Sequence, residues 1–146
     1  MINFVARGLC LLVLPIALSF AFYIHCFGES SPGGGFQAGL LIASCLILVH
    51  LSFNKHLLNN KTCICIICYA ILTYICFGIA CLAIEGDFLN LNLFASGKMN
   101  YLFSHYFNLN PKIASQKLSI FFAETCILAV VTCCCYQLYR AVLTKN

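Results

Sequence analysis

Glu124 is the side chain with the clearest capacity for chemistry, because it is the only acidic or basic residue in an otherwise apolar stretch, residues 118–139. A carboxyl group inside hydrocarbon costs roughly 2.5–3.5 kcal/mol on insertion scales, and desolvation disfavours its charged form. The surrounding Leu, Ile, Phe and Val residues, at about −0.3 to −0.6 kcal/mol each, still allow the segment to insert. Two interpretations follow. Either Glu124 exchanges a proton or attracts a cation inside a bundle or a water-filled cavity, or it is a hydrogen-bonded strut that fixes helix register.

Cysteine is the second residue type that could carry chemistry, with 12 copies that fall almost entirely within apolar runs. Two groups have spacings found in metal or thiol sites: Cys63, Cys65 and Cys68, and Cys133, Cys134 and Cys135. A thiolate is disfavoured in hydrocarbon, so we expect packing residues here and predict neither a metal nor another cofactor. A membrane thiol oxidase is the alternative, but it needs cysteine pairs in outer loops, and residues 85–117 contain none.

A glycine-rich run between two apolar segments requires an explanation other than hydrophobicity. Ser31 is a good helix N-cap and Pro32 suits the first helical position, so we expect a helix to begin there. Three consecutive glycines follow, each costing roughly 1 kcal/mol in a helix relative to alanine. Glycine permits close approach of another backbone, and free amides at a helix N-terminus attract negative charge. We favour close approach.

Small residues continue along one face of that helix. Gly35, Gly39 and Ala43 recur every four residues, the spacing that lets membrane helices pack backbone to backbone. The run as a whole is therefore interpreted as a helix-packing loop that receives a helix of a neighbouring subunit: Ser31, Pro32, Gly33, Gly34, Gly35, Gly39 and Ala43. On the opposite face, Gln37 is expected to be a polar neighbour of Glu124 in the bundle.

Composition places these residues in a membrane. The chain of 146 residues is 62% hydrophobic and 8% charged, whereas soluble domains carry about 25% charged residues. About 20 apolar residues cross the hydrocarbon core, and four stretches meet that length. They span about 8–28, 32–53, 62–84 and 118–139. We predict an all-α integral membrane protein, a bundle of four transmembrane helices in one domain, residues 1–146.

Orientation follows from the basic residues, which favour the cytoplasmic side. Five Lys or Arg share one side of the predicted bundle and three share the other, so both termini are expected to be cytoplasmic and residues 85–117 extracytoplasmic. The apolar run that follows Arg7 is longer than a signal peptide core and is expected to be retained. His25, near the end of the first span, is interpreted as an interfacial polar residue, with a titrating role as the alternative.

Several function classes are disfavoured. The basic residues form no patch, which argues against nucleic acid as a partner. Four acidic residues in the chain, without a nucleophile triad, a zinc-protease helix or a phosphate loop, argue against an independent enzyme. The expected partners are other membrane subunits and the lipid bilayer.

The run Gly28-Glu29-Ser30-Ser31-Pro32-Gly33-Gly34-Gly35-Phe36-Gln37-Ala38-Gly39 resembles the B subunit of the Mrp-type multisubunit sodium/proton antiporter, an MnhB-like domain. Fainter similarity occurs at residues 85–89 and 116–124. The resemblance implies an accessory subunit of a monovalent cation/proton antiporter in the bacterial inner membrane, with Glu124 at the position of the family's carboxylate in the last span. Two alternatives remain: a purely structural subunit of a related respiratory or hydrogenase-type complex, and a membrane thiol or redox protein.

Overall fold

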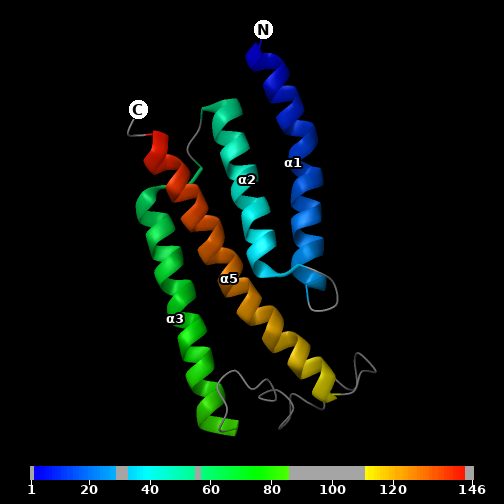
Figure 1. Ribbon diagram of the computed structural model, residues 1–146, viewed down its shortest axis with the longest axis vertical. Coiled ribbons are helices and arrows are strands. Elements are labelled where there is room, and N and C mark those ends of the chain that lie inside the picture. The colour runs from blue at the N-terminus through cyan, green and yellow to red at the C-terminus, as the bar shows by residue number, and fades with distance from the viewer. Residues whose placement is uncertain (1, 29–32, 55–56, 86–110, 144–146) are drawn as a thin grey trace.

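The computed structural model describes residues 2–28, 33–54, 57–85 and 111–143, which form four helices (Figure 1). Their bounds are Ile2–Phe27 (α1), Gly35–Phe53 (α2), Asn60–Glu85 (α3) and Pro111–Leu143 (α5). Each is long and apolar enough to cross a membrane. The expected all-helical class is therefore confirmed, with four helices that are suited to span a membrane.

Two helix starts differ from the sequence prediction. Helix α2 begins at Gly35 rather than at Pro32, and its N-cap is Gly34. Gly34 has φ 123°, a conformation that side chains with a Cβ rarely adopt, so the chain turns there before it can become helical. Ser31 and Pro32 lie outside the described residues. Helix α5 begins at Pro111 rather than near Leu118, with proline in the first helical position, and residues 111–117 extend the helix beyond the apolar span.

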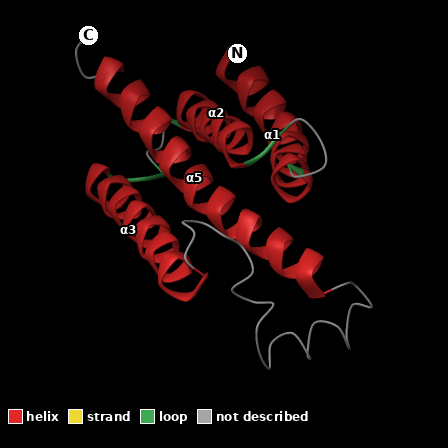
Figure 2. Ribbon diagram, turned by 60° about the horizontal axis from the view of Figure 1, so that its bottom comes forward, coloured by secondary structure: helices red, strands yellow, loops and turns green. Residues whose placement is uncertain are grey.

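The four helices form an open row rather than a closed bundle. Helix α2 packs against α1 on one side and α5 on the other, and α3 packs against the far side of α5. Figures 1 and 2 show α5 running obliquely between α2 and α3. In the sequence, the short polar connector at residues 54–61 predicts a tight hairpin of the second and third spans, but this prediction was wrong, because α5 separates α2 from α3. The N-terminus of α1 and the C-terminus of α5 lie on the same side of the row, at the top in Figure 1.

Where α2, α3 and α5 converge, a small cluster of side chains fills the interior. Cys63, Cys133 and Tyr136 are buried, and partly buried aliphatic residues of α2 and α3 surround them. These cysteines therefore pack as small apolar residues, as the sequence indicated. Within the described residues, no three His, Cys, Asp or Glu side chains are grouped in a way that could hold a metal ion.

Polar contacts tie the helices together at the end that carries the termini. Arg7 donates from Nε to the Ser52 carbonyl at 3.2 Å and lies over the Phe53 ring. Arg140 donates to the Leu58 carbonyl at 3.1 Å. Arg7 thus binds a carbonyl in the last turn of α2, where a positive charge is favoured, whereas Arg140 binds the connection between α2 and α3.

Candidate functional site

Glu124 lies near the middle of α5, four residues inside the apolar part of that helix, Ile120–Leu143. At 1.5 Å per residue, this depth is about one helical turn. Figure 1 shows the start of α2 beside α5, close to the midpoint of α5. The glycine-rich run and the acidic residue, which are about 90 residues apart in the chain, therefore meet.

The carboxyl group of Glu124 occupies space that glycine leaves open. A Cβ atom at Gly28 would lie 3.1 Å from Glu124 Oε2, and a Cβ atom at Gly34 would lie 3.2 Å from Oε1. Both are tighter than ordinary van der Waals contacts. Glycine at the end of α1 and at the start of α2 thus allows two backbone segments to enclose one carboxyl group.

The main chains of α2 and α5 also touch directly. A Cβ atom at Gly35 would collide with the carbonyl oxygen of Glu124, and one at Gly39 would lie 2.9 Å from the Leu128 carbonyl oxygen. The Gly39 carbonyl in turn accepts a hydrogen bond of 3.1 Å from the buried hydroxyl of Thr132. The small-residue face of α2 lies against α5 of the same chain at Gly35 and Gly39, whereas the sequence analysis expected a helix of a neighbouring subunit there.

Helix α2 also supplies an electrostatic reason for this arrangement. Its first backbone hydrogen bond runs from the Ala38 N–H to the Gly34 carbonyl, at 3.1 Å. The three amides that precede Ala38 in the helix therefore have no acceptor within α2, and the helix dipole adds partial positive charge at the same place. A carboxylate beside Gly34 lies at this positive end. Close approach and anion attraction, weighed above as alternatives, act together here.

His25 belongs to the same site, and the sequence did not place it there. Its side chain is only 6% exposed, at the last turn of α1. Its Nε2 lies 3.1 Å from the Thr125 hydroxyl, and its ring centroid lies 4.6 Å from that of Phe121. The sequence does place His25 one helical turn before Gly28. That spacing could indicate that His25 lies near Glu124 only if the contact between Gly28 and α5 were already known.

The remaining predicted residues fall in different places. Gln37 is exposed on α2, so within this chain it is not enclosed with Glu124. Its role as a polar neighbour of Glu124 remains a prediction for the assembled complex. Ala43 is buried, and Gly33 lies against Ile24 of α1.

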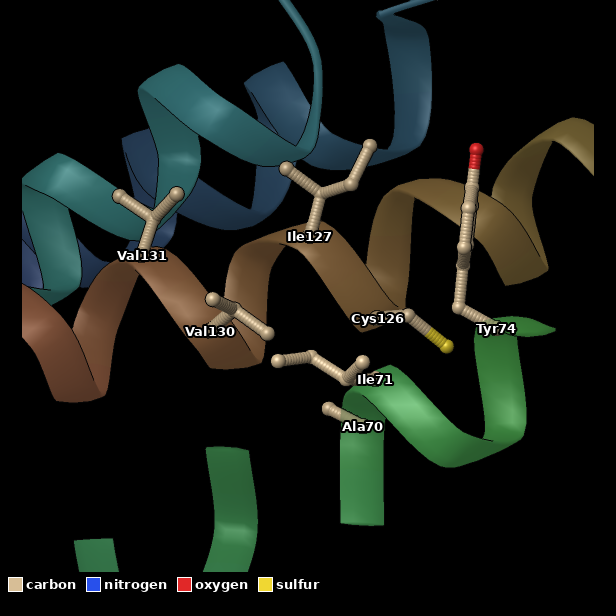
Figure 3. Close-up of a pocket in the computed structure, with 7 residues that line it drawn as sticks. All are labelled: Ala70, Ile71, Tyr74, Cys126, Ile127, Val130 and Val131. Carbon is tan, nitrogen blue, oxygen red and sulfur yellow. The ribbon is translucent and has the colours of Figure 1, made fainter. Parts of the chain in front are cut away.

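A separate groove lies between α3 and α5, away from Glu124 (Figure 3). Its volume is about 310 Å³, and seven residues line it: Ala70, Ile71, Tyr74, Cys126, Ile127, Val130 and Val131. The lining is almost wholly apolar, with no acid or base. The groove therefore lacks the carboxyl and imidazole groups that lie on the other side of α5, at Glu124 and His25.

Comparison with known proteins bears on these observations. Residues 5–136 match the family model described as a domain related to the MnhB subunit of Na+/H+ antiporters. The chain belongs to this family. The matched region includes the glycine-rich run, His25 and Glu124, and the resemblance inferred from the sequence is thereby confirmed.

Individual relatives match over a shorter region. A protein of Staphylococcus aureus (strain Newman) named "Putative antiporter subunit mnhB2" is 46% identical over 50 residues, which is 34% of this chain and 36% of that protein. Its namesake in Staphylococcus haemolyticus (strain JCSC1435) is 42% identical over 52 residues, 36% of this chain and 37% of that protein. The chain thus aligns with about a third of the length of these relatives. No solved structure matches it significantly.

Proposed function

We propose that this MnhB-family chain is an accessory subunit of a multisubunit monovalent cation/proton antiporter in the bacterial inner membrane. Other antiporter subunits are its partners, and protons and monovalent cations are the species moved by the complex. Within that complex, Glu124 exchanges a proton or attracts a cation. Its role is that of a component, without an enzymatic activity of its own.

One observation carries this proposal: the Glu124 carboxyl group lies inside an apolar helix, against Gly28 and Gly34, at the N-terminus of α2. A carboxyl group in a membrane is costly and persists where it has a role or a partner. Here the positive end of α2 supports the ionised form, while the apolar surroundings favour the neutral form. A site balanced between these two effects can change its charge.

The proposed orientation has both termini in the cytoplasm. Its support is the excess of Lys and Arg at the end of the row that carries the termini, where Arg7 and Arg140 bind carbonyl groups. Glu124 then lies in the half of the membrane nearer the extracytoplasmic side, about one turn inside the apolar part of α5.

The decisive experiment replaces the carboxyl group without changing its shape. In membrane vesicles that contain the co-expressed complex, we expect Glu124→Gln to lower sodium-driven proton exchange at least tenfold, with the amount of assembled complex unchanged. Glu124→Asp should retain part of the exchange, because the acid remains but reaches less far. Ser44→Ala is the matched control, since Ser44 is exposed and its hydroxyl bonds only to the Leu40 carbonyl of its own helix.

A purely structural subunit is the second candidate, and the backbone contact between Gly35 and Glu124 favours it. In that case Glu124→Gln would leave ion exchange intact, whereas Gly35→Leu would prevent assembly. Both variants belong in one experiment, because loss of assembly alone fits either function.

A further inference from the structure

His25 has an unusual hydrogen-bonding state. Its Nε2 has a partner, the Thr125 hydroxyl, but its Nδ1 is buried and has no hydrogen-bond partner in the described part of the chain. A buried polar atom without a partner is uncommon and calls for an explanation. Here the atom belongs to an imidazole ring, either nitrogen of which can carry a hydrogen.

The Thr125 hydroxyl fixes which ring nitrogen carries the hydrogen. That hydroxyl lies 2.7 Å from the Phe121 carbonyl, and its single hydrogen is donated there. It can therefore only accept from His25, so Nε2 is the protonated nitrogen of the neutral ring. The unpartnered Nδ1 then carries a lone pair, which makes it a vacant proton acceptor.

Two features near His25 can carry negative charge or partial negative charge. Glu124 precedes Thr125 on α5, and its carboxyl group contacts Gly28, which lies one turn after His25 on α1. The C-terminus of α1 adds partial negative charge near the ring, because His25 lies in the last turn of that helix. From α2, residues 33–39 contribute no titratable side chain. On α1 itself, the neighbouring titratable side chains are exposed: Tyr23 and Cys26.

We infer that His25 is a second proton-binding site, loaded at Nδ1 and coupled to Glu124. A proton from water binds the Nδ1 lone pair, no covalent bond of the chain breaks, and Nε2 keeps its hydrogen bond to Thr125. The imidazolium so formed faces the C-terminus of α1, while the Glu124 carboxylate faces the N-terminus of α2. Each of the two charged groups is thus stabilised by a helix end and by the opposite charge of the other group. This inference rests on the proposed function and adds a residue to its site.

Proton exchange by the assembled complex provides the functional test. We expect His25→Gln to lower exchange at least tenfold and to flatten its dependence on pH, because the amide can donate to Thr125 but cannot titrate. His50→Gln is the matched control: His50 is 7% exposed and lies in the last turn of α2, beside Tyr139 at the other end of the row. Proton exchange by the His50→Gln complex should stay within about twofold of that of the unmodified complex.

A spectroscopic measurement keeps the inference testable if His25→Gln fails to assemble. Nitrogen-15 NMR of histidine-labelled complex distinguishes protonated from unprotonated ring nitrogens, and the chain has four histidines. We expect one neutral ring to carry its hydrogen on Nε2 and to gain a proton on Nδ1 as the pH falls. The His50→Gln spectrum should retain this signal. The inference would be overturned if the neutral His25 ring carried its hydrogen on Nδ1, or if the His25 ring gained no proton as the pH falls.

Comparison of the two acid–base residues separates the inference from the proposed function. Unchanged exchange in Glu124→Gln contradicts the proposed function. Lost exchange in Glu124→Gln, together with an unaltered pH dependence in His25→Gln, contradicts only the assignment of His25.

Discussion

The two sides of α5 are built in opposite ways. Toward α2, glycine brings main chain against main chain, and a hydroxyl, a carboxyl group and an imidazole lie at or beside the contact. Toward α3, side chains make the contact and leave an apolar groove of about 310 Å³ (Figure 3). Interhelical polar contacts also join α5 to α3. One is weak, at 4.0 Å between Cys126 Sγ and the Thr73 hydroxyl, and another lies at the first residue of α3, where Gln137 Nε2 donates to the Asn60 carbonyl at 3.3 Å.

This contrast indicates how the chain divides its tasks. Helices in a membrane gain little from the hydrophobic effect on association, so close packing and interhelical hydrogen bonds hold them together. The α2 side of α5 has both features, and its closest contacts surround Glu124. The closely packed backbone contacts of α5 thus lie around Glu124, whereas the side of α5 that faces α3 leaves a groove unfilled.

A large loss of stability is expected when one methyl group is added on the side of α5 that faces α2, the tight side. Gly35→Ala places a Cβ atom against the Glu124 carbonyl, and the main chain there cannot move aside without separating α2 from α5. We expect a loss of about 3 kcal/mol in the free energy of unfolding, the upper part of the usual range for overpacking. Unfolding in detergent, followed by circular dichroism, measures this loss.

Gly8→Ala is the control for that substitution. No atom lies within 4 Å of the position that its Cβ would occupy, and Gly8 is exposed on α1. Alanine should therefore stabilise the helix there, by up to about 1 kcal/mol. Equal effects of the two substitutions would show that the contact between α2 and α5 is looser than the structure indicates.

The next effect concerns Tyr136, in the cluster where α2, α3 and α5 converge. Its side chain is fully buried, and its hydroxyl has no hydrogen-bond partner among the described residues. Tyr136→Ala should cost about 3–5 kcal/mol through the cavity it leaves. Tyr136→Phe should instead stabilise by about 1 kcal/mol, because it removes an unsatisfied polar group. Thermal unfolding of both variants in detergent tests this reversal of sign, and a destabilised Tyr136→Phe would contradict it.

A smaller effect compares one hydroxyl on each side of α5. Thr132→Val removes the hydrogen bond to the Gly39 carbonyl, and interhelical hydrogen bonds in membranes average about 0.6 kcal/mol with a maximum near 1.7. Thr73→Val removes a hydroxyl that bonds mainly to carbonyls of its own helix, so its cost should be lower. Unfolding titrations with a denaturing detergent give the two values, and the reverse order would argue against the contrast between the two sides.

The sequence revealed the elements of this fold better than their arrangement. Long apolar stretches define membrane helices directly, and the glycine spacing on α2 correctly identified a close-packing face. Helix order was not predictable, because apolar surfaces in lipid do not encode which helix lies beside which. The prediction therefore assigned a partner subunit to the face that α5 fills, and it paired the second span with the third.

Prediction of the site was limited in a similar way. Glu124 stood out because charge is rare in a membrane helix, whereas the significance of His25 depends on its burial and on its bond to Thr125. Those are tertiary properties. The exposure of Gln37 also depends on tertiary structure. Helix periodicity shows which residues share a face, but it does not show which face packs against another helix.

The smallest expected change in stability comes from a substitution in the groove on the side of α5 that faces α3. Ala70 lines it and is only 6% exposed, so Ala70→Val adds two methyl groups where space remains. New contacts with α5 should offset the lower helix propensity of valine, and the free energy of unfolding should change by less than about 0.5 kcal/mol. The same two methyl groups on the tight side, in Ala38→Val, meet a position with 0% exposure and should cost about 1–3 kcal/mol. Chemical unfolding of the two variants under identical conditions compares the sides directly. If Ala70→Val is as costly as Ala38→Val, the groove is closed in solution and the asymmetry of α5 is lost.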